Sequence, residues 1–244
     1  MRYKLTISYN GALFFGSQSQ KNTSQTVLGK FEGVLKKLQI NSKIVASGRT
    51  DRGVHATGQV IHFDVPDFWN DKKRLHTILN QKLPPSIRVK KVELVNDEFH
   101  ARYSASRRVY RYVLCEGEAN PFEYDFITFH KKIDLELLEN SIKLFEGKHN
   151  FEMFKKSGSP TTNFVRTIYK TSAYRHKEKV VLHFEADGYL RSQIRLMVGF
   201  LLQINDKILD ETQLQDQLSN VTQHSTFIAP CNGLYLAKIK YPLH

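Results

Sequence analysis

The sequence has little of what builds a disulfide framework, a thiolate metal site or a membrane span. Its 244 residues hold two cysteines, Cys115 and Cys231, which form neither a disulfide framework nor a paired-thiolate metal motif. No run approaches the roughly 18 consecutive apolar residues that indicate a membrane-spanning helix. The N-terminal residues Met1–Lys4 lack the apolar core of a signal peptide. We therefore expect a protein of a reducing compartment, the cytoplasm, with no membrane association.

The chain also has fewer acidic than basic residues. The chain has 24 Asp and Glu against 36 Lys and Arg, which gives a formal net charge of +12 and a pI near 9.6. A soluble protein this basic favours an anionic partner, and nucleic acid is the first candidate. The alternative is a lysine-rich surface without a specific partner, because net charge by itself speaks only to non-specific binding.

Most of the common catalytic motifs are missing as well. The glycines between Ser47 and Gln59 fit neither the dinucleotide-binding nor the P-loop pattern. The histidines show no metal-ligand spacing: His55 and His62 stand seven apart, with no Cys or carboxylate at ligand distance. No nucleophile elbow, activated cysteine or pair of acids is apparent. We expect no cofactor and no metal.

The hydrophobic pattern predicts an α+β protein of two similar halves, residues 1–104 and 105–244. The first half has the order β-α-β-β-α-β, a ferredoxin-like pattern, and the second repeats it loosely. Expected strands span 3–9, 59–64, 87–94, 109–114, 166–173, 179–186 and 234–241, and expected helices span 25–38, 71–81, 135–145, 190–204 and a shorter segment after Asp210. Ser24, Asp134 and Asp210 are the expected helix N-caps.

The stretch Ser47–Gln59 contains one acid, Asp51, between Arg49 and Arg52, and three glycines. Its glycine content predicts a shaped loop rather than a helix or a strand interior. Asp51 is either the cap of a turn or a nucleophile that a nearby guanidinium keeps ionised and aimed. His55 is a candidate to hold the loop through a hydrogen bond.

Two distant stretches supply possible partners for this acid. Residues 102–112 interleave arginines with tyrosines, a combination that can meet phosphates and stack on unpaired bases; the alternative is an exposed basic strand edge. Arg195 lies in a mainly apolar helical segment, where a buried guanidinium needs an anionic partner. Asp51 is a reasonable candidate for that partner.

Taken together, these stretches resemble the TruA family of tRNA pseudouridine synthases. The most specific element is Gly-Arg-Thr-Asp-x-Gly-Val-His-Ala, which stands at 48–56. Further ordered matches run through most of the chain: Phe15-Gly16 with Gln18 and Gln20, Leu79-Asn80 with Leu83-Pro84, Phe99–Arg102, Arg166–Ile168, and Ala229-Pro230 with Gly233–Leu236.

The resemblance implies an isomerase that converts uridine to pseudouridine in the tRNA anticodon arm, at positions 38 to 40. It implies Asp51 as the nucleophile, Tyr110 against the target uracil, Arg195 paired with Asp51, and Arg49 assisting extrusion of the base. Arg52, Gln18, His55 and Arg108 complete the expected substrate-binding residues. It also implies two ferredoxin-like halves that form a mixed, mainly antiparallel sheet around a central cleft, and a homodimer that grips one tRNA.

The chain departs from the family pattern at a few positions. Ser17 stands where the family usually has Trp, Arg52 where Ala is common after the catalytic Asp, and Ser192–Leu196 where the family has His-Met-Val-Arg-Asn. None of these changes removes an expected catalytic residue. A non-catalytic RNA-binding protein and an RNA-processing nuclease are the rival hypotheses. The first predicts loss of Asp51 or Arg195, and the second predicts clustered acids or a His pair; the sequence shows neither.

Overall fold

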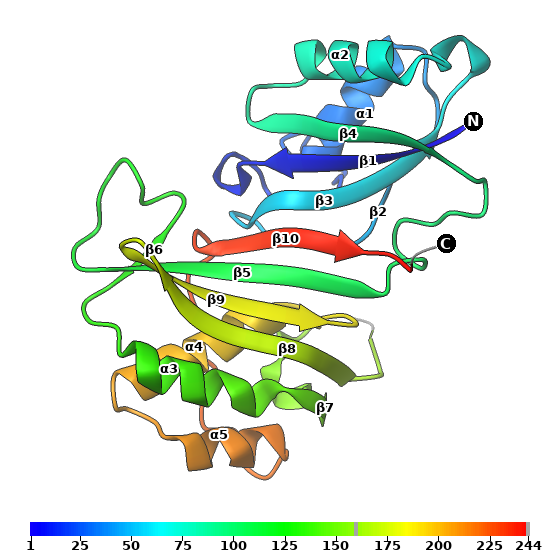
Figure 1. The fold of residues 1–244 in the computed structure, drawn as a ribbon. Coiled ribbons are helices and arrows are strands. Elements are labelled where there is room, and N and C mark those ends of the chain that lie inside the picture. The colour runs from blue at the N-terminus through cyan, green and yellow to red at the C-terminus, as the bar shows by residue number, and fades with distance from the viewer. Residues whose placement is uncertain (159–160, 243–244) are drawn as a thin grey trace. The chain divides into compact units, whose positions relative to one another are not determined.

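The computed structural model describes residues 1–158 and 161–242. The chain divides into two compact units: Met1–Ser106 together with the C-terminal segment from Tyr235, and Arg107–Leu234. Each unit combines helices with a sheet (Figure 1), so the predicted α+β class is confirmed. The predicted halves 1–104 and 105–244 stay a prediction. No helix in the described ranges is both long and apolar enough to cross a membrane.

The first unit has the predicted ferredoxin-like order of elements. Its strands are β1 (Arg2–Tyr9), β2 (Val45–Ala46), β3 (His55–Asp64) and β4 (Ile87–Val95), with helices α1 (Val27–Lys37) and α2 (Lys72–Lys82) and 3-10 turns at Gly11–Leu13 and Asp67–Trp69. The order β4-β1-β3 is antiparallel throughout. On the other edge of β3, β2 pairs antiparallel and β10 (Leu234–Lys240) pairs parallel.

Alternation and helical periodicity explain these elements. Tyr3, Leu5 and Ile7 of β1 are all buried, as expected for every second residue of a half-buried strand. The predicted N-cap of the first helix, Ser24, is wrong: Thr26 caps α1, and its hydroxyl accepts a hydrogen bond from the Gly29 amide at 3.1 Å. Both residue types cap helices, so only the actual start of the helix decides between them.

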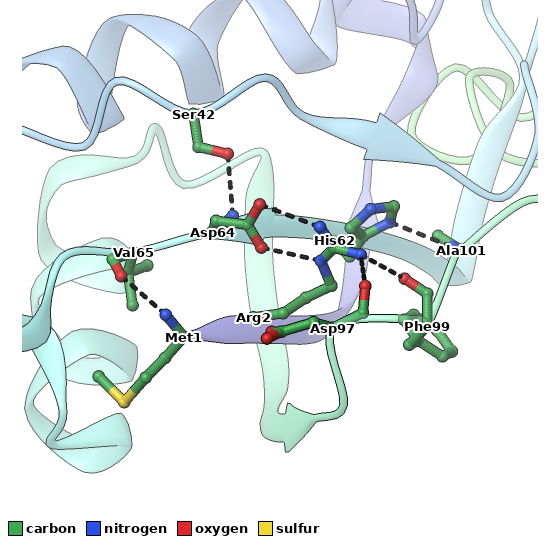
Figure 2. A network of polar contacts seen from close by, with 9 residues as sticks. All are labelled: Met1, Arg2, Ser42, His62, Asp64, Val65, Asp97, Phe99 and Ala101. Carbon is green, nitrogen blue, oxygen red and sulfur yellow. Dashed lines mark hydrogen bonds and ion pairs between the residues drawn. The ribbon is translucent and has the colours of Figure 1, made fainter.

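A polar network ties the N-terminus to the first sheet (Figure 2). Arg2 forms a bidentate ion pair with Asp64, with N–O distances of 2.8 and 3.0 Å, and it also donates to the Phe99 carbonyl at 3.1 Å. Next to it, the Nδ1 atom of His62 accepts a hydrogen bond from the Ala101 amide at 3.1 Å. Burial lowers the pKa of His62 to about 4, so this imidazole is neutral at physiological pH and remains an acceptor.

Apart from two additional short strands, the second unit repeats the β-α-β-β-α order of the first unit up to the helix Gln193–Asn205. Its strands are β5 (Arg107–Glu116), β6 (Thr128–His130), β7 (Gly147–Asn150), β8 (Val165–His176) and β9 (Lys179–Ala186), and its helices are α3 (Leu135–Ser141), α4 (Gln193–Asn205) and α5 (Glu211–Leu218). The neighbours β5-β9-β8-β7 pair antiparallel, and β6 pairs parallel with β5. The strand that follows in sequence, β10, pairs with β3 of the first unit.

The helix starts in this unit are mostly as predicted. Asp134 and Asp210 cap α3 and α5, the second through a full capping box with Gln213. The predicted helix 135–145 instead ends at Ser141 and continues as a 3-10 turn, Ile142–Phe145. The predicted helix 190–204 begins only at Gln193, because Ser192 has a left-handed φ of 57°, a conformation that a right-handed helix excludes.

Candidate active site

The acid-bearing loop is shorter than the sequence predicts. Strand β3 begins at His55, so the expectation that Ser47–Gln59 contains no strand interior is wrong for its last five residues. Gly58 explains the error: a Cβ there would lie 2.2 Å from the Ala237 carbonyl oxygen of β10. The glycine therefore permits the close approach of a neighbouring strand. The loop proper is Ser47–Val54.

Hydrogen bonds from outside the loop fix the residue before Asp51. The Thr50 amide donates to the Ser17 hydroxyl at 2.9 Å, and the Ser17 amide donates to the Thr50 carbonyl at 3.1 Å. The Thr50 hydroxyl shares a hydrogen bond of 2.8 Å with the Tyr9 hydroxyl, whose pKa burial raises to about 12. Ser17, the departure from the family pattern, is thus a buried support of the loop.

Gln59 holds the beginning of the loop against β3. Its side-chain oxygen accepts from the Ser47 hydroxyl at 2.6 Å, and its amide nitrogen donates to the Gly48 carbonyl at 2.9 Å. Beyond Asp51, the Val54 amide donates to the Asp51 carbonyl at 3.2 Å. The backbone of Asp51 is therefore anchored on both sides, while its side chain stays half-buried. This is the geometry that an aimed carboxylate needs.

His55, the first residue of β3, ties the end of the loop to the 3-10 turn at Gly11–Leu13. It is 1% exposed, its Nδ1 accepts a hydrogen bond from the Gly11 amide at 3.0 Å, and its ring stacks on Tyr235 with centroids 4.7 Å apart. Its expected substrate contact stays a prediction.

The remaining candidates of the first unit are exposed. Arg49, Arg52 and Gln18 all reach solvent. The Arg52 guanidinium lies 4.6 Å from the ring centroid of Phe15, which is itself 44% exposed. A cation over an exposed aromatic ring beside the acid is a surface on which a base or a phosphate can be received.

The second unit carries the other three predicted residues. Tyr110 on β5 is 9% exposed, and its ring meets Tyr189 edge to face with centroids 5.3 Å apart. Arg108, two residues earlier, donates to the Asp187 carbonyl at 2.6 Å. Both residues are thus positioned by the segment that follows β9.

Arg195 on α4 is held by the segment before β10. Its Nε donates to the Ala229 carbonyl at 2.7 Å, and the Ala229 amide returns a bond of 3.0 Å to the Arg195 carbonyl. Tyr112 on β5 fixes the neighbouring Pro230 carbonyl at 2.8 Å. The guanidinium therefore has a defined orientation within its unit. The pairing of Arg195 and Tyr110 with Asp51, which lies in the other unit, stays a prediction.

Sequence reasoning missed the residues that support the site: Tyr9, Ser17, Gln59 and Tyr189. Gln59, which closes the glycine-rich stretch, and Ser17, between Gly16 and Gln18, lay inside motifs already singled out, but neither was assigned a supporting role. In residues 1–158 and 161–242, no group of three or more His, Cys, Asp or Glu side chains could hold a metal ion.

Comparisons with known proteins show what this chain is similar to. A sequence model of the family described as tRNA pseudouridine synthase matches residues 5–104 and 141–242. Relatives named tRNA pseudouridine synthase A include proteins of Helicobacter hepaticus (38% identical over 98% of each chain), Helicobacter pylori (40%, over 98% of this chain and 99% of the relative) and Campylobacter jejuni (35%, over 99% and 100%). The crystal structure of a Cbf5-Nop10-Gar1 complex matches 82% of this chain and 44% of that chain, with a TM-score of 0.38 and 10% identity.

The chain belongs to the tRNA pseudouridine synthase family, a class of isomerases. Its relatives carry the name tRNA pseudouridine synthase A, so the TruA resemblance drawn from the motifs is confirmed.

Proposed function

We propose that this enzyme isomerises uridine to pseudouridine in the anticodon stem-loop of tRNA, at positions 38 to 40, with Asp51 as the nucleophile. The anchored Asp51 loop is the observation that carries the proposal. Its backbone is fixed on both sides and its carboxylate is half-buried, which suits a group that must stay aimed while it reacts.

The reaction is an isomerisation and needs no imported group. The bond between N1 and C1′ breaks, the uracil rotates, and a bond between C5 and C1′ forms, while C5 loses a proton and N1 gains one. Asp51 forms a covalent bond either to the uracil ring or to C1′ and is released at the end. Arg195 pairs with Asp51 and keeps it ionised. Tyr110 lies against the uracil and takes part in the proton transfer.

The target base lies in or beside a stem, so it must be extruded at a cost of about a few kcal/mol. Arg49 offsets that cost by entering the space the base leaves. Arg52, Gln18 and Arg108 contact the RNA around it, and the exposed stack of Arg52 on Phe15 offers one such surface.

The +12 charge supplies most of the affinity. Because lysines and arginines displace counterions from the phosphates, the dissociation constant for tRNA should rise steeply with salt. The slope of the logarithm of the dissociation constant against the logarithm of the salt concentration, measured by filter binding or fluorescence anisotropy, quantifies this effect. A slope near zero would contradict an electrostatic interface.

The enzyme acts in the cytoplasm as a homodimer that grips one tRNA. Light scattering after size-exclusion chromatography, with and without tRNA, tests the stoichiometry. A monomer with one bound tRNA at working concentrations would refute the dimer.

Asp51→Asn tests the nucleophile. The protein is incubated with unmodified tRNA transcripts, and pseudouridine is mapped by chemical derivatisation and primer extension. The wild type should form pseudouridine at 38 to 40, and Asp51→Asn should form none while it binds tRNA with nearly unchanged affinity. Asp67→Asn, the same change at an exposed acid outside the loop, should keep full activity.

Two outcomes would overturn parts of the proposal. Full activity of Asp51→Asn refutes the nucleophile. A wild-type protein that binds tRNA but modifies none of the transcripts favours the binding-only alternative.

A further inference from the structure

Tyr189 has an unusual hydroxyl group. In the described parts of the chain, only two buried side-chain polar atoms lack a hydrogen-bond partner: the Tyr189 hydroxyl and the Asn220 Oδ1. Asn220 still uses its amide nitrogen, which donates to the Asn150 and Leu218 carbonyls. Tyr189 has no other polar side-chain atom, so its one polar group is unpaired. Such a group lowers stability unless something else binds it.

Hydrogen bonds hold the backbone on both sides of Tyr189. Asp187, two residues before it, is held by its amide, which donates to the Thr167 carbonyl at 3.2 Å, and by its carbonyl, which accepts from Arg108 at 2.6 Å. The following Leu190 amide donates to the buried side chain of Gln193 at 2.8 Å. Because both flanks are clamped, the unpaired hydroxyl is a fixed feature of this unit.

Tyr189 also lies beside a residue of the proposed site. Its ring meets that of Tyr110 edge to face, at 5.3 Å and 82°. A phenylalanine at position 189 would make the same ring contact and would leave no polar group unpaired. Ring packing therefore does not account for the hydroxyl.

The hydroxyl is a donor under working conditions. Burial, with smaller contributions from Tyr110 and the carboxylates of Glu185 and Asp187, raises the pKa of Tyr189 well above its usual range. The phenol stays protonated and has an O–H to offer. A uracil next to Tyr110 presents two carbonyl oxygens as acceptors.

We propose that the Tyr189 hydroxyl donates a hydrogen bond to a carbonyl oxygen of the target uracil, beside Tyr110. This rests on the proposed function, because it takes the uracil to lie against Tyr110. Tyr189 is then a substrate-contacting residue that distinguishes a base with a carbonyl at this position from one without it.

Tyr189→Phe tests the contact on an anticodon stem-loop RNA. We expect kcat/KM to fall about five- to tenfold, the effect of one lost neutral hydrogen bond, while the melting temperature stays equal or rises. Tyr3→Phe is the matched control: the Tyr3 hydroxyl donates to the Trp69 and Asn70 carbonyls at 3.2 and 3.0 Å. It should lower the melting temperature and leave kcat/KM unchanged.

A second test changes the substrate instead of the enzyme. Stem-loops with 2-thiouridine or 4-thiouridine at the target replace one carbonyl oxygen by sulfur, a weaker acceptor. With one of these thiouridine stem-loops, kcat/KM of the wild type should fall about as much as the Tyr189→Phe substitution lowers it on the normal stem-loop. The same thiouridine should lower kcat/KM of Tyr189→Phe little further.

The outcomes distinguish failure of the Tyr189 contact from failure of the proposed function. Tyr189→Phe activity within twofold of the wild type, or thio substitutions that slow both enzymes equally, overturns the contact and leaves the proposed function standing. A wild type that forms no pseudouridine on the normal stem-loop overturns the proposed function and this contact with it.

Discussion

Gln59→Leu should loosen the Asp51 loop while it preserves the strand. Gln59 is 1% exposed, and its side chain accepts from the Ser47 hydroxyl at 2.6 Å and donates to the Gly48 carbonyl at 2.9 Å. Leucine fills a similar volume but cannot make either bond. The Ser47 hydroxyl is buried and would be left unpaired, whereas the Gly48 carbonyl is half-buried and can reach water.

The Ser47 and Gly48 groups set a lower limit on the magnitude, because the Gln59 side-chain oxygen also accepts from the Val60 amide at 3.1 Å, and leucine removes that bond too. An unpaired buried hydroxyl costs about 1–3 kcal/mol, and a lost bond to a partly hydrated carbonyl costs about 1 kcal/mol. The free energy of unfolding should therefore fall by about 2–4 kcal/mol, which lowers the melting temperature by roughly 5–12 °C in a chain of this size. At a temperature where the variant is still folded, kcat should fall about tenfold to a hundredfold, because the proposed nucleophile Asp51 would be misplaced.

The assay combines thermal unfolding with single-turnover pseudouridine formation well below the melting temperature. Asn80→Leu is the control, because the Asn80 amide clamps both backbone groups of Val89 on β4, at 2.9 and 3.0 Å, and touches no part of the loop. It should cost similar stability with unchanged kcat. Equal kcat for Gln59→Leu and the wild type would refute the claim that this clamp aims Asp51.

Two further predictions concern stability. Gly58→Ala places a Cβ 2.2 Å from the Ala237 carbonyl oxygen and should lower the free energy of unfolding by about 2 kcal/mol or more. Gly33→Ala, in α1 with no atom within 4 Å of the new Cβ, should raise it by about 0.5–1 kcal/mol. Urea unfolding of both variants measures the contrast, and equal effects would refute it. Burial lowers the pKa of His62 from 6.5 in the unfolded chain to about 4 in the folded chain. Between these pH values His62 is protonated in the unfolded chain and neutral in the folded chain, so neutral His62 contributes fully to the free energy of unfolding above pH 6.5 and loses that contribution as the pH falls toward 4. Urea unfolding of the wild type and of His62→Gln at pH values between about 4 and 6.5 should show a smaller dependence of the unfolding free energy on pH for the variant. The same pH dependence in both proteins would contradict the assignment.

Much of the first unit follows from local sequence. Alternation in Tyr3, Leu5 and Ile7 predicts β1, and apolar spacing predicts α1 and α2, because strand and helix periods place every second or every third to fourth residue on one face. Asp134 and Asp210 were found as caps for the same local reason. The fold class followed from these patterns, and the family followed from the motif around Asp51 together with the ordered matches along the rest of the chain.

Contacts between distant residues decided the rest. Glycine suggests a loop, but Gly58 stands inside strand β3 because only a residue without a Cβ leaves room for the Ala237 carbonyl. Ser17 is a departure from the family pattern, and only the structure shows that it forms hydrogen bonds with Thr50.

By itself, the sequence predicted which residues carry the chemistry: Asp51 and Arg49 from one motif, and Tyr110 and Arg195 from two others. Only the tertiary structure decided what holds them, namely Gln59 and Ser17 around Asp51, Ala229 on Arg195 and Tyr189 beside Tyr110. The physical reason is that a motif records the residue types that a reaction needs. A hydrogen bond between positions tens of residues apart exists only after the chain has folded and leaves no periodic signal along it.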